Sequence, residues 1–346
     1  MKKTFFAIVV IVLFSSHTMF LKLDSYFLEP NSSVALQLFN GTFEKSENII
    51  ARNRMLDASI LSNGIRTKVS DSQWTEKDSI TILNFQTEDA GTYVAGVSTK
   101  ARDFKMNAKV FNEYLEHEGL YDMLEWRRQN NALDSNAIEK YSKHVKTIFQ
   151  VGAIKTNDWQ TELGYPIEFV PLENPYNLHT GDSLELKLLL NGKPLANQLV
   201  YADYKNPKNS HSHNALKAAE EHGHSHDGEV NSHTHESKES EESHTHTSGQ
   251  KLRTNEEGII KTHLFADGIW YFQTIHIVNT QKEELTHESN WSTLTFEVTH
   301  THGEETHTHE HQHETNNSIY IFLLGSLLLI GVLFLWFNRR KNENKN

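Results

Sequence analysis

Cysteine is absent from this 346-residue sequence, which narrows the chemistry that the protein can perform. Without a thiol there is no cysteine nucleophile, no cysteine-ligated zinc or iron–sulfur cluster, and no disulfide framework. Any metal must therefore be bound through nitrogen and oxygen ligands. Catalytic motifs are missing too, since there is neither a GxSxG elbow nor a glycine-rich phosphate loop. We therefore predict that the protein is not an enzyme.

An excess of positive charge is also absent. The chain has 33 lysines and arginines against 45 acidic residues, which gives a formal net charge of −12. A protein that tracks nucleic-acid phosphates needs a basic face, so we expect no nucleic-acid partner. Most of the negative charge lies in two segments: residues 209–250 carry −6 and residues 300–318 carry −4. The rest of the chain is nearly neutral.

The same two segments hold most of the histidine. We call residues 205–250 the histidine-rich loop and residues 300–318 the histidine-rich linker. Together they contain fifteen of the 22 histidines, many spaced as His-x-His. These fifteen are His211, His213, His222, His224, His226, His233, His235, His244, His246, His300, His302, His307, His309, His311 and His313.

Imidazoles at this spacing suit divalent transition metals. In an extended chain alternate side chains point the same way, so each His-x-His unit presents two rings to one side. Neutral imidazole binds nickel, cobalt, zinc or copper, and the ligands alone do not select among them. We expect several ions to bind, exchange quickly and leave as the pH falls through about 6.5. The alternative is that both segments are solvated spacers.

Two apolar runs predict how the chain is placed in the cell. Residues 1–16 have a basic start, an apolar stretch and small residues after it, as a secretory signal peptide does. Ile319–Phe337 is long enough to be a transmembrane helix, and residues 338–346 form a basic cytoplasmic tail. We expect a single-pass cell-membrane protein whose main domain faces the periplasm or exterior. An uncleaved N-terminal anchor is the alternative.

The remaining residues predict a mainly β fold with two immunoglobulin-like β-sandwich subdomains. Short alternating runs place the first sandwich at residues 17–106, with Asn40-Gly41 as a hairpin turn, and the second at 150–299, interrupted by the histidine-rich loop. Residues 107–149 have helical periodicity and form a short helical insertion. Its third helix is expected to start at Ser135, with Asp134 as N-cap.

Short motifs spread over residues 17–298 resemble one family of exported domains. They include Phe111–Leu115 with Glu118-Gly119-Leu120, Tyr141-Ser142-Lys143, Gly164–Glu168 and Trp291–Phe296. In this order they resemble the family called domain of unknown function 4198. The resemblance implies an exported two-sandwich protein linked to nickel uptake. The family's mature start usually reads His-Asp-Phe-Trp, whereas Thr18 follows His17 here, which removes one oxygen ligand.

That start suggests a second kind of metal site. If cleavage occurs between Ser16 and His17, the free α-amine and the ring of His17 can chelate one ion together. His276 matches a family histidine and is a candidate further ligand. The alternative, which we prefer, is that His276 is a hydrogen-bonded histidine on a half-buried strand.

These features predict a membrane-anchored protein that binds divalent transition metals outside the cytoplasmic membrane. Uptake, buffering or delivery of the metal are the expected roles, with a metal permease as a candidate partner. The alternative from another class is a non-enzymatic adhesion or interaction module. In that case the histidine-rich segments serve only as spacers.

Overall fold

A computed structural model describes residues 18–206 and 249–300. Strands make up 51% of the structure, arranged in several sheets with two α-helices, so the mainly β prediction is confirmed. The immunoglobulin-like topology of the sandwiches stays a prediction. The signal peptide, most of the histidine-rich loop, nearly all of the linker and the expected transmembrane helix lie outside these residues.

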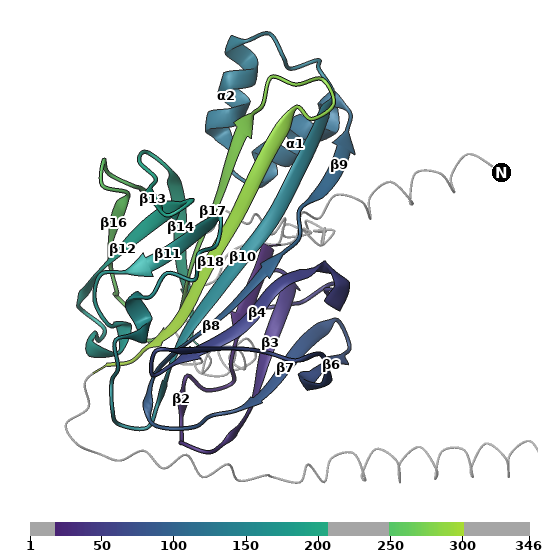
Figure 1. The fold of residues 1–346 in the computed structure, drawn as a ribbon. Helices are drawn as coiled ribbons and strands as arrows, with labels where there is room; N and C mark the ends of the chain where they lie inside the picture. Colours follow the sequence, from purple (N-terminus) through teal and green to yellow (C-terminus); the bar gives the residue numbers. More distant parts are fainter. Residues whose placement is uncertain (1–17, 207–248, 301–346) are drawn as a thin grey trace, which may run out of the picture. The chain divides into compact units, whose positions relative to one another are not determined.

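The largest sheet, which we call sheet B, runs through the whole described region (Figure 1). Its long strands β10, β17 and β18 lie side by side at its centre, with β10 and β18 parallel and β17 antiparallel to β18. In spatial order its strands are β15 (Gln250–Arg253), β14 (Leu199–Lys205), β17 (Gly268–Asn279), β18 (His287–Val298), β10 (Ala137–Val151), β8 (Gly91–Thr99), β4 (Met55–Ser62) and β5 (Ile65–Lys68), with β2 (Phe27–Leu28) and β9 (Arg102–Met106) also paired to β10.

Two smaller sheets pack against opposite faces of sheet B. Sheet A consists of β1 (Thr18–Lys22), β3 (Ser33–Gly41), β7 (Ile80–Gln86) and β6 (Trp74–Lys77). Sheet C consists of β11 (Ile167–Pro171), β12 (Ser183–Leu190), β13 (Lys193–Pro194) and β16 (Ile259–His263). Neighbouring residues of sheet B show the division, because Phe149 lies in the core with sheet A and Ile148 in the core with sheet C. The two layer pairs therefore share sheet B.

This double coverage overturns the prediction of a third helix from Ser135. The residues concerned form β10, and Asp134 caps no helix. Both faces of β10 are buried over most of its length, so it lacks the alternation of a half-exposed strand. Buried polar side chains such as Lys143 and Lys146 stand among its apolar ones, so the sequence does not mark one face as exposed. The apolar residues Ile138, Tyr141, Val145 and Ile148 are also spaced as on one face of a helix, which explains the wrong prediction.

The other two expected helices are present and cover one end of sheet B (Figure 1). Helix α1 (Ala108–His117) begins at Asn107, whose side chain accepts a hydrogen bond from the Val110 amide and so caps the helix. Helix α2 (Tyr121–Gln129) follows after a short loop. Buried Phe111 and Leu115 anchor α1 in a small core with β9 and β10.

The two Asn-Gly pairs behave differently. Asn191 and Gly192 both have positive φ angles and form the tight turn between β12 and β13, as expected. Asn40 and Gly41 instead end strand β3, where Gly41 bridges to Ser46 across the following loop. The predicted turn at Asn40-Gly41 is therefore wrong. Gly41 is needed there for space, since an added Cβ would meet the backbone oxygen of Lys45.

The described residues fall in one compact unit that ends at Thr301, and the second unit, His302–Asn346, lies outside them. Within residues 18–206 and 249–300, neither helix is long and apolar enough to cross a membrane.

Candidate functional site

Most of the predicted metal ligands lie beyond the described residues. This applies to His17, to all nine candidates of the loop, and to the linker candidates from His302 onward. Among residues 18–206 and 249–300, no cluster of three or more His, Asp or Glu side chains is placed to hold a metal ion. Metal binding by the histidine-rich segments therefore stays a prediction.

The described residues do show where the two segments are attached. The loop follows β14 and returns in β15, its antiparallel neighbour, so it is inserted in a hairpin. Lys205 at the end of β14 and Glu297 near the end of β18 both align with Ile269 of β17. Because adjacent strands are ~4.8 Å apart, these two ends lie about 10 Å from each other.

Contacts around the start of β17 confirm that both segments leave from this place. The backbone of Gly268 packs so closely against Lys205 and Asn206 that an added Cβ would collide with them. The preceding residue, Asp267, contacts the ring of His300, the first residue of the linker. The two histidine-rich segments, whose starting points are nearly a hundred residues apart in the sequence, thus leave from one end of sheet B.

His276 is a partly buried histidine on β17. Its Nδ1 lies 2.9 Å from Gln198 Oε1, and burial lowers the pKa of the ring. Its neighbours Ile275 and Ile277 line a pocket that Thr18 also lines, but His276 does not. This placement fits the hydrogen-bonded alternative for His276.

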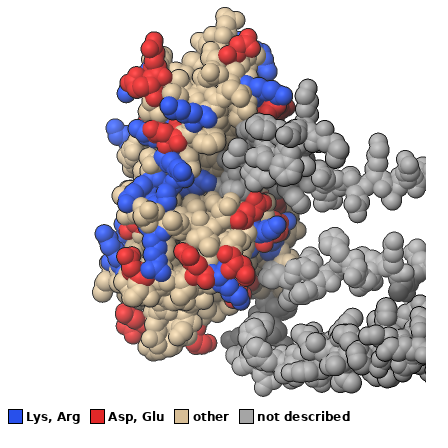
Figure 2. All heavy atoms as spheres, turned by 90° about the vertical axis from the view of Figure 1, so that its right-hand side faces the viewer, with Lys and Arg blue, Asp and Glu red and all other residues tan. Residues whose placement is uncertain are grey.

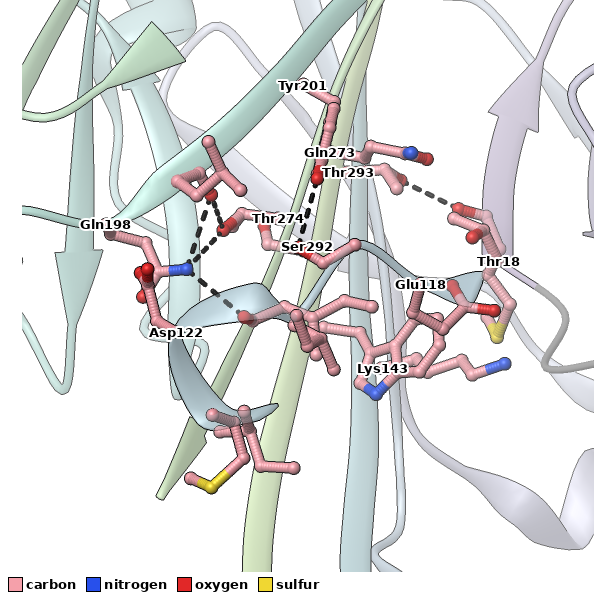
Figure 3. Close-up of a pocket in the computed structure, with 18 of the residues that line it drawn as sticks. Thr18, Glu118, Asp122, Lys143, Gln198, Tyr201, Gln273, Thr274, Ser292 and Thr293 are labelled. Atoms are coloured by element: carbon pink, nitrogen blue, oxygen red, sulfur yellow. Dashed lines mark hydrogen bonds between the residues drawn. The ribbon is translucent and has the colours of Figure 1, made fainter. Parts of the chain in front are cut away.

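That pocket lies between the start of β1, the loop that joins α1 to α2, and the middle of sheet B (Figure 3). Its volume is about 70 Å³. Since one water needs roughly 10–15 Å³ by this measure, the space fits a group of about five heavy atoms. Its polar lining includes Glu118, Lys143, Ser292 and Thr18, and its apolar lining includes Trp291.

Charged groups are buried in and beside this pocket. Glu118 is 3% exposed and Lys143 is 8% exposed. The Lys143 ammonium lies 4.9 Å from the centre of the Trp291 ring, and burial lowers its pKa to about 8. Burial also raises the pKa of nearby Glu139 to about 7. Such a group of shifted acids and bases is typical of functional sites, although structural ion networks produce it as well.

None of these pocket residues was predicted as a site residue. Three of the motifs that carried the family resemblance nevertheless meet here, since they contain Glu118, Lys143 and Trp291. Glu118 follows directly after α1, Lys143 is on β10 and Trp291 is on β18, and these parts of the chain lie far apart in the sequence. Local sequence patterns could therefore identify the three motifs, but they could not show that the motifs line the same pocket.

Outside the pocket, acidic and basic side chains are interspersed over the face shown in Figure 2. This agrees with the nearly neutral charge expected for the chain apart from its histidine-rich segments.

A comparison with protein families decides the membership of the chain. The model described as "Domain of unknown function (DUF4198)" matches residues 14–278. The chain belongs to the DUF4198 family. The match confirms the resemblance carried by the motifs, while the link to nickel uptake and export stays a prediction.

Other comparisons add little to the DUF4198 assignment. No curated protein matches the sequence. A crystal structure of a mutant Salmonella alpha-2-macroglobulin matches with a TM-score of 0.20 and 8% identity, over 81% of this chain but only 15% of that one. The D0-D1 domain of Intimin matches with a TM-score of 0.17 and 10% identity, over 82% of this chain and 97% of that one. At these TM-scores neither structure supports an argument about fold or function.

Proposed function

We propose that this DUF4198 protein is anchored by one C-terminal helix with its main domain outside the cytoplasmic membrane. There it binds divalent nickel, cobalt, zinc or copper through its histidine-rich loop and linker. The bound metal serves uptake, buffering or delivery, with a metal permease as the receiving partner.

The single observation that carries this proposal is that the two segments leave the fold at the same place. Lys205, the last residue of β14, and Glu297, near the end of β18, lie about 10 Å apart on either side of β17. Histidines from both segments can thus reach the same ion, which raises the effective concentration of ligands around it. A spacer needs no such arrangement.

Calorimetric titration of the full-length chain in detergent with Ni²⁺, Zn²⁺ and Cu²⁺ tests the proposal. Replacing the nine loop histidines by glutamine, or the six linker histidines, should each lower the number of ions bound. Because both segments contribute ligands to the same ion, each replacement should also weaken the binding of the ions that remain. Binding should fall steeply as the pH drops below about 6.5, where imidazole becomes protonated.

A matched control replaces the eight acidic residues of positions 209–250 by glutamine or asparagine, which keeps every histidine. This variant should retain most of the bound ions. Unchanged stoichiometry after loss of all fifteen histidines would contradict the proposal and favour the adhesion module.

A further inference from the structure

A lysine and an asparagine meet in the buried layer between sheets A and B. Lys143 lies on β10 of sheet B, and Asn40 lies near the end of β3 of sheet A. Lys143 Nζ is 3.4 Å from Asn40 Oδ1, and the two residues are 8% and 7% exposed. Because Oδ1 is bonded to Asn40 Cγ at ~1.2 Å, the nitrogen is also close to that carbon. The fold thus holds an amine and an amide carbon together, away from bulk water.

The surroundings of Lys143 favour the uncharged form of its amine. Nζ lies 4.9 Å from the centre of the Trp291 ring and 5.8 Å from the centre of the Tyr141 ring. Burial lowers the pKa of Lys143 to about 8, although the charges of Glu118 and Glu139 act in the opposite direction. A desolvated lysine loses its proton more readily than an exposed one, and its neutral amine is a nucleophile.

A buried carboxyl group stands beside this amine. Glu118 is 3% exposed and lines the same pocket as Lys143 (Figure 3). It attracts the Lys143 charge more strongly than Glu139 does. Its carboxylate contacts His117 Nδ1 at 3.1 Å, and a carboxylate offers about four acceptor sites. Glu118 is therefore placed to take a proton from the amine and to pass it on.

We propose that Lys143 and Asn40 become joined by an isopeptide bond once the chain has folded. The neutral Lys143 amine attacks Asn40 Cγ, so that an Nζ–Cγ bond forms and the Cγ–Nδ2 bond breaks. Glu118 takes the proton that Nζ gives up and returns it to Nδ2, which leaves as ammonia. The products are one amide and one ammonia molecule, so the step consumes no oxidant and no co-reactant.

The position of this bond suits a chain without disulfides. Cysteine is absent from the sequence, so no disulfide can tie the sheets together. The two residues are 103 positions apart and belong to different sheets of one layer pair. A crosslink that closes so long a loop restricts the unfolded chain strongly and thereby stabilises the folded one.

Peptide mass spectrometry of the purified full-length chain tests the bond directly. Trypsin should release residues 23–45 linked to residues 141–146, at a mass about 17 Da below the sum of the two peptides because ammonia has left. Lys143→Met and Asn40→Ala should each abolish the linked peptide and lower the Tm by roughly 10 °C or more. Lys140→Met, a half-buried position on the same strand, is the matched control and should keep the linkage.

The role of Glu118 is tested by the yield of the linked peptide. Glu118→Gln should give far less of it than the wild type, whereas Glu116→Gln, exposed on the preceding helix, should give the same amount. Equal yields in Glu118→Gln and the wild type would overturn the role of Glu118.

Absence of the linked peptide from the folded wild type would overturn the crosslink itself. This measurement needs no variant, so a substitution that prevents folding leaves the test intact. Metal titration of the histidine-rich segments is independent of it, and either proposal can fail alone.

Discussion

Lys146 Nζ lies 2.9 Å from Glu168 Oε2, and both side chains are almost completely buried between sheets B and C. The ammonium also donates to the Phe169 carbonyl oxygen at 2.9 Å. The carboxylate accepts three backbone amides, those of residues 163–165. This pair joins the long central strand β10 to the edge of sheet C through β11. Both charged groups thus have further hydrogen-bond partners besides each other.

Removing one partner of this pair should strongly destabilise the protein. Lys146→Met leaves the Glu168 carboxylate buried without its cation, which typically costs about 3–5 kcal/mol. Urea unfolding of Lys146→Met, Glu168→Gln and the double variant measures the coupling. The double variant should lose much less than the sum of the two singles. Strict additivity would show that the pair contributes no interaction of its own.

Stability should fall in mild acid because of His144. Its ring lies between Ser98 and Ser142, at 2.9 and 3.0 Å, and burial lowers its pKa to about 4. The unfolded chain binds this proton near the ordinary value of ~6.5, so the contribution is complete above that pH and is lost as the pH falls to about 4. This contribution of His144 to the free energy of unfolding is about 3 kcal/mol. His144→Asn should flatten the dependence of Tm on pH between about 7 and 5, while a slope equal to that of the wild type would contradict this assignment.

Glu139 should act in the opposite direction. Burial raises its pKa to about 7, and the hydroxyls of Ser289 and Tyr114 donate to its carboxyl group. Its folded pKa lies above the unfolded one, so its contribution is present in acid and is lost as the pH rises through about 7. Glu139→Gln stays neutral throughout and should lose less stability than the wild type between about pH 6 and pH 8. Chemical denaturation at both pH values checks this, with exposed Glu116→Gln as control.

Gly96 should not tolerate even one additional carbon. A Cβ at this position of β8 would collide with the Leu163 side chain and come within 2.6 Å of the Tyr165 hydroxyl oxygen. Overpacking of this kind usually costs about 1–3 kcal/mol. Gly96→Ala should therefore lower the Tm, and Leu163→Ala should recover part of the loss by making room. If Gly96→Ala is as stable as the wild type, the segment before β11 that carries Leu163 and Tyr165 does not pack this closely on β8.

Local patterns predicted the strands that have one covered face and a well-formed turn. Alternation in residues 184–188 identified β12, and Asn191-Gly192 identified the turn that follows it. The two helices were predicted because Phe111 and Leu115, and then Leu120 and Leu124, recur at helical spacing. The same reasoning failed at β10, whose polar and apolar side chains are buried alike because two sheets cover its two faces.

The sequence by itself determined that any metal chemistry runs on nitrogen and oxygen ligands, and that charge and histidine are concentrated in two segments. Only the tertiary structure decided that both segments leave from one end of sheet B, and that Glu118, Lys143 and Trp291 line one pocket. The physical reason is the pairing of distant strands, since Lys143 of β10 aligns with Trp291 of β18. Backbone hydrogen bonds between such strands are much the same for any side chains, so the sequence of one strand does not predict which strand it pairs with.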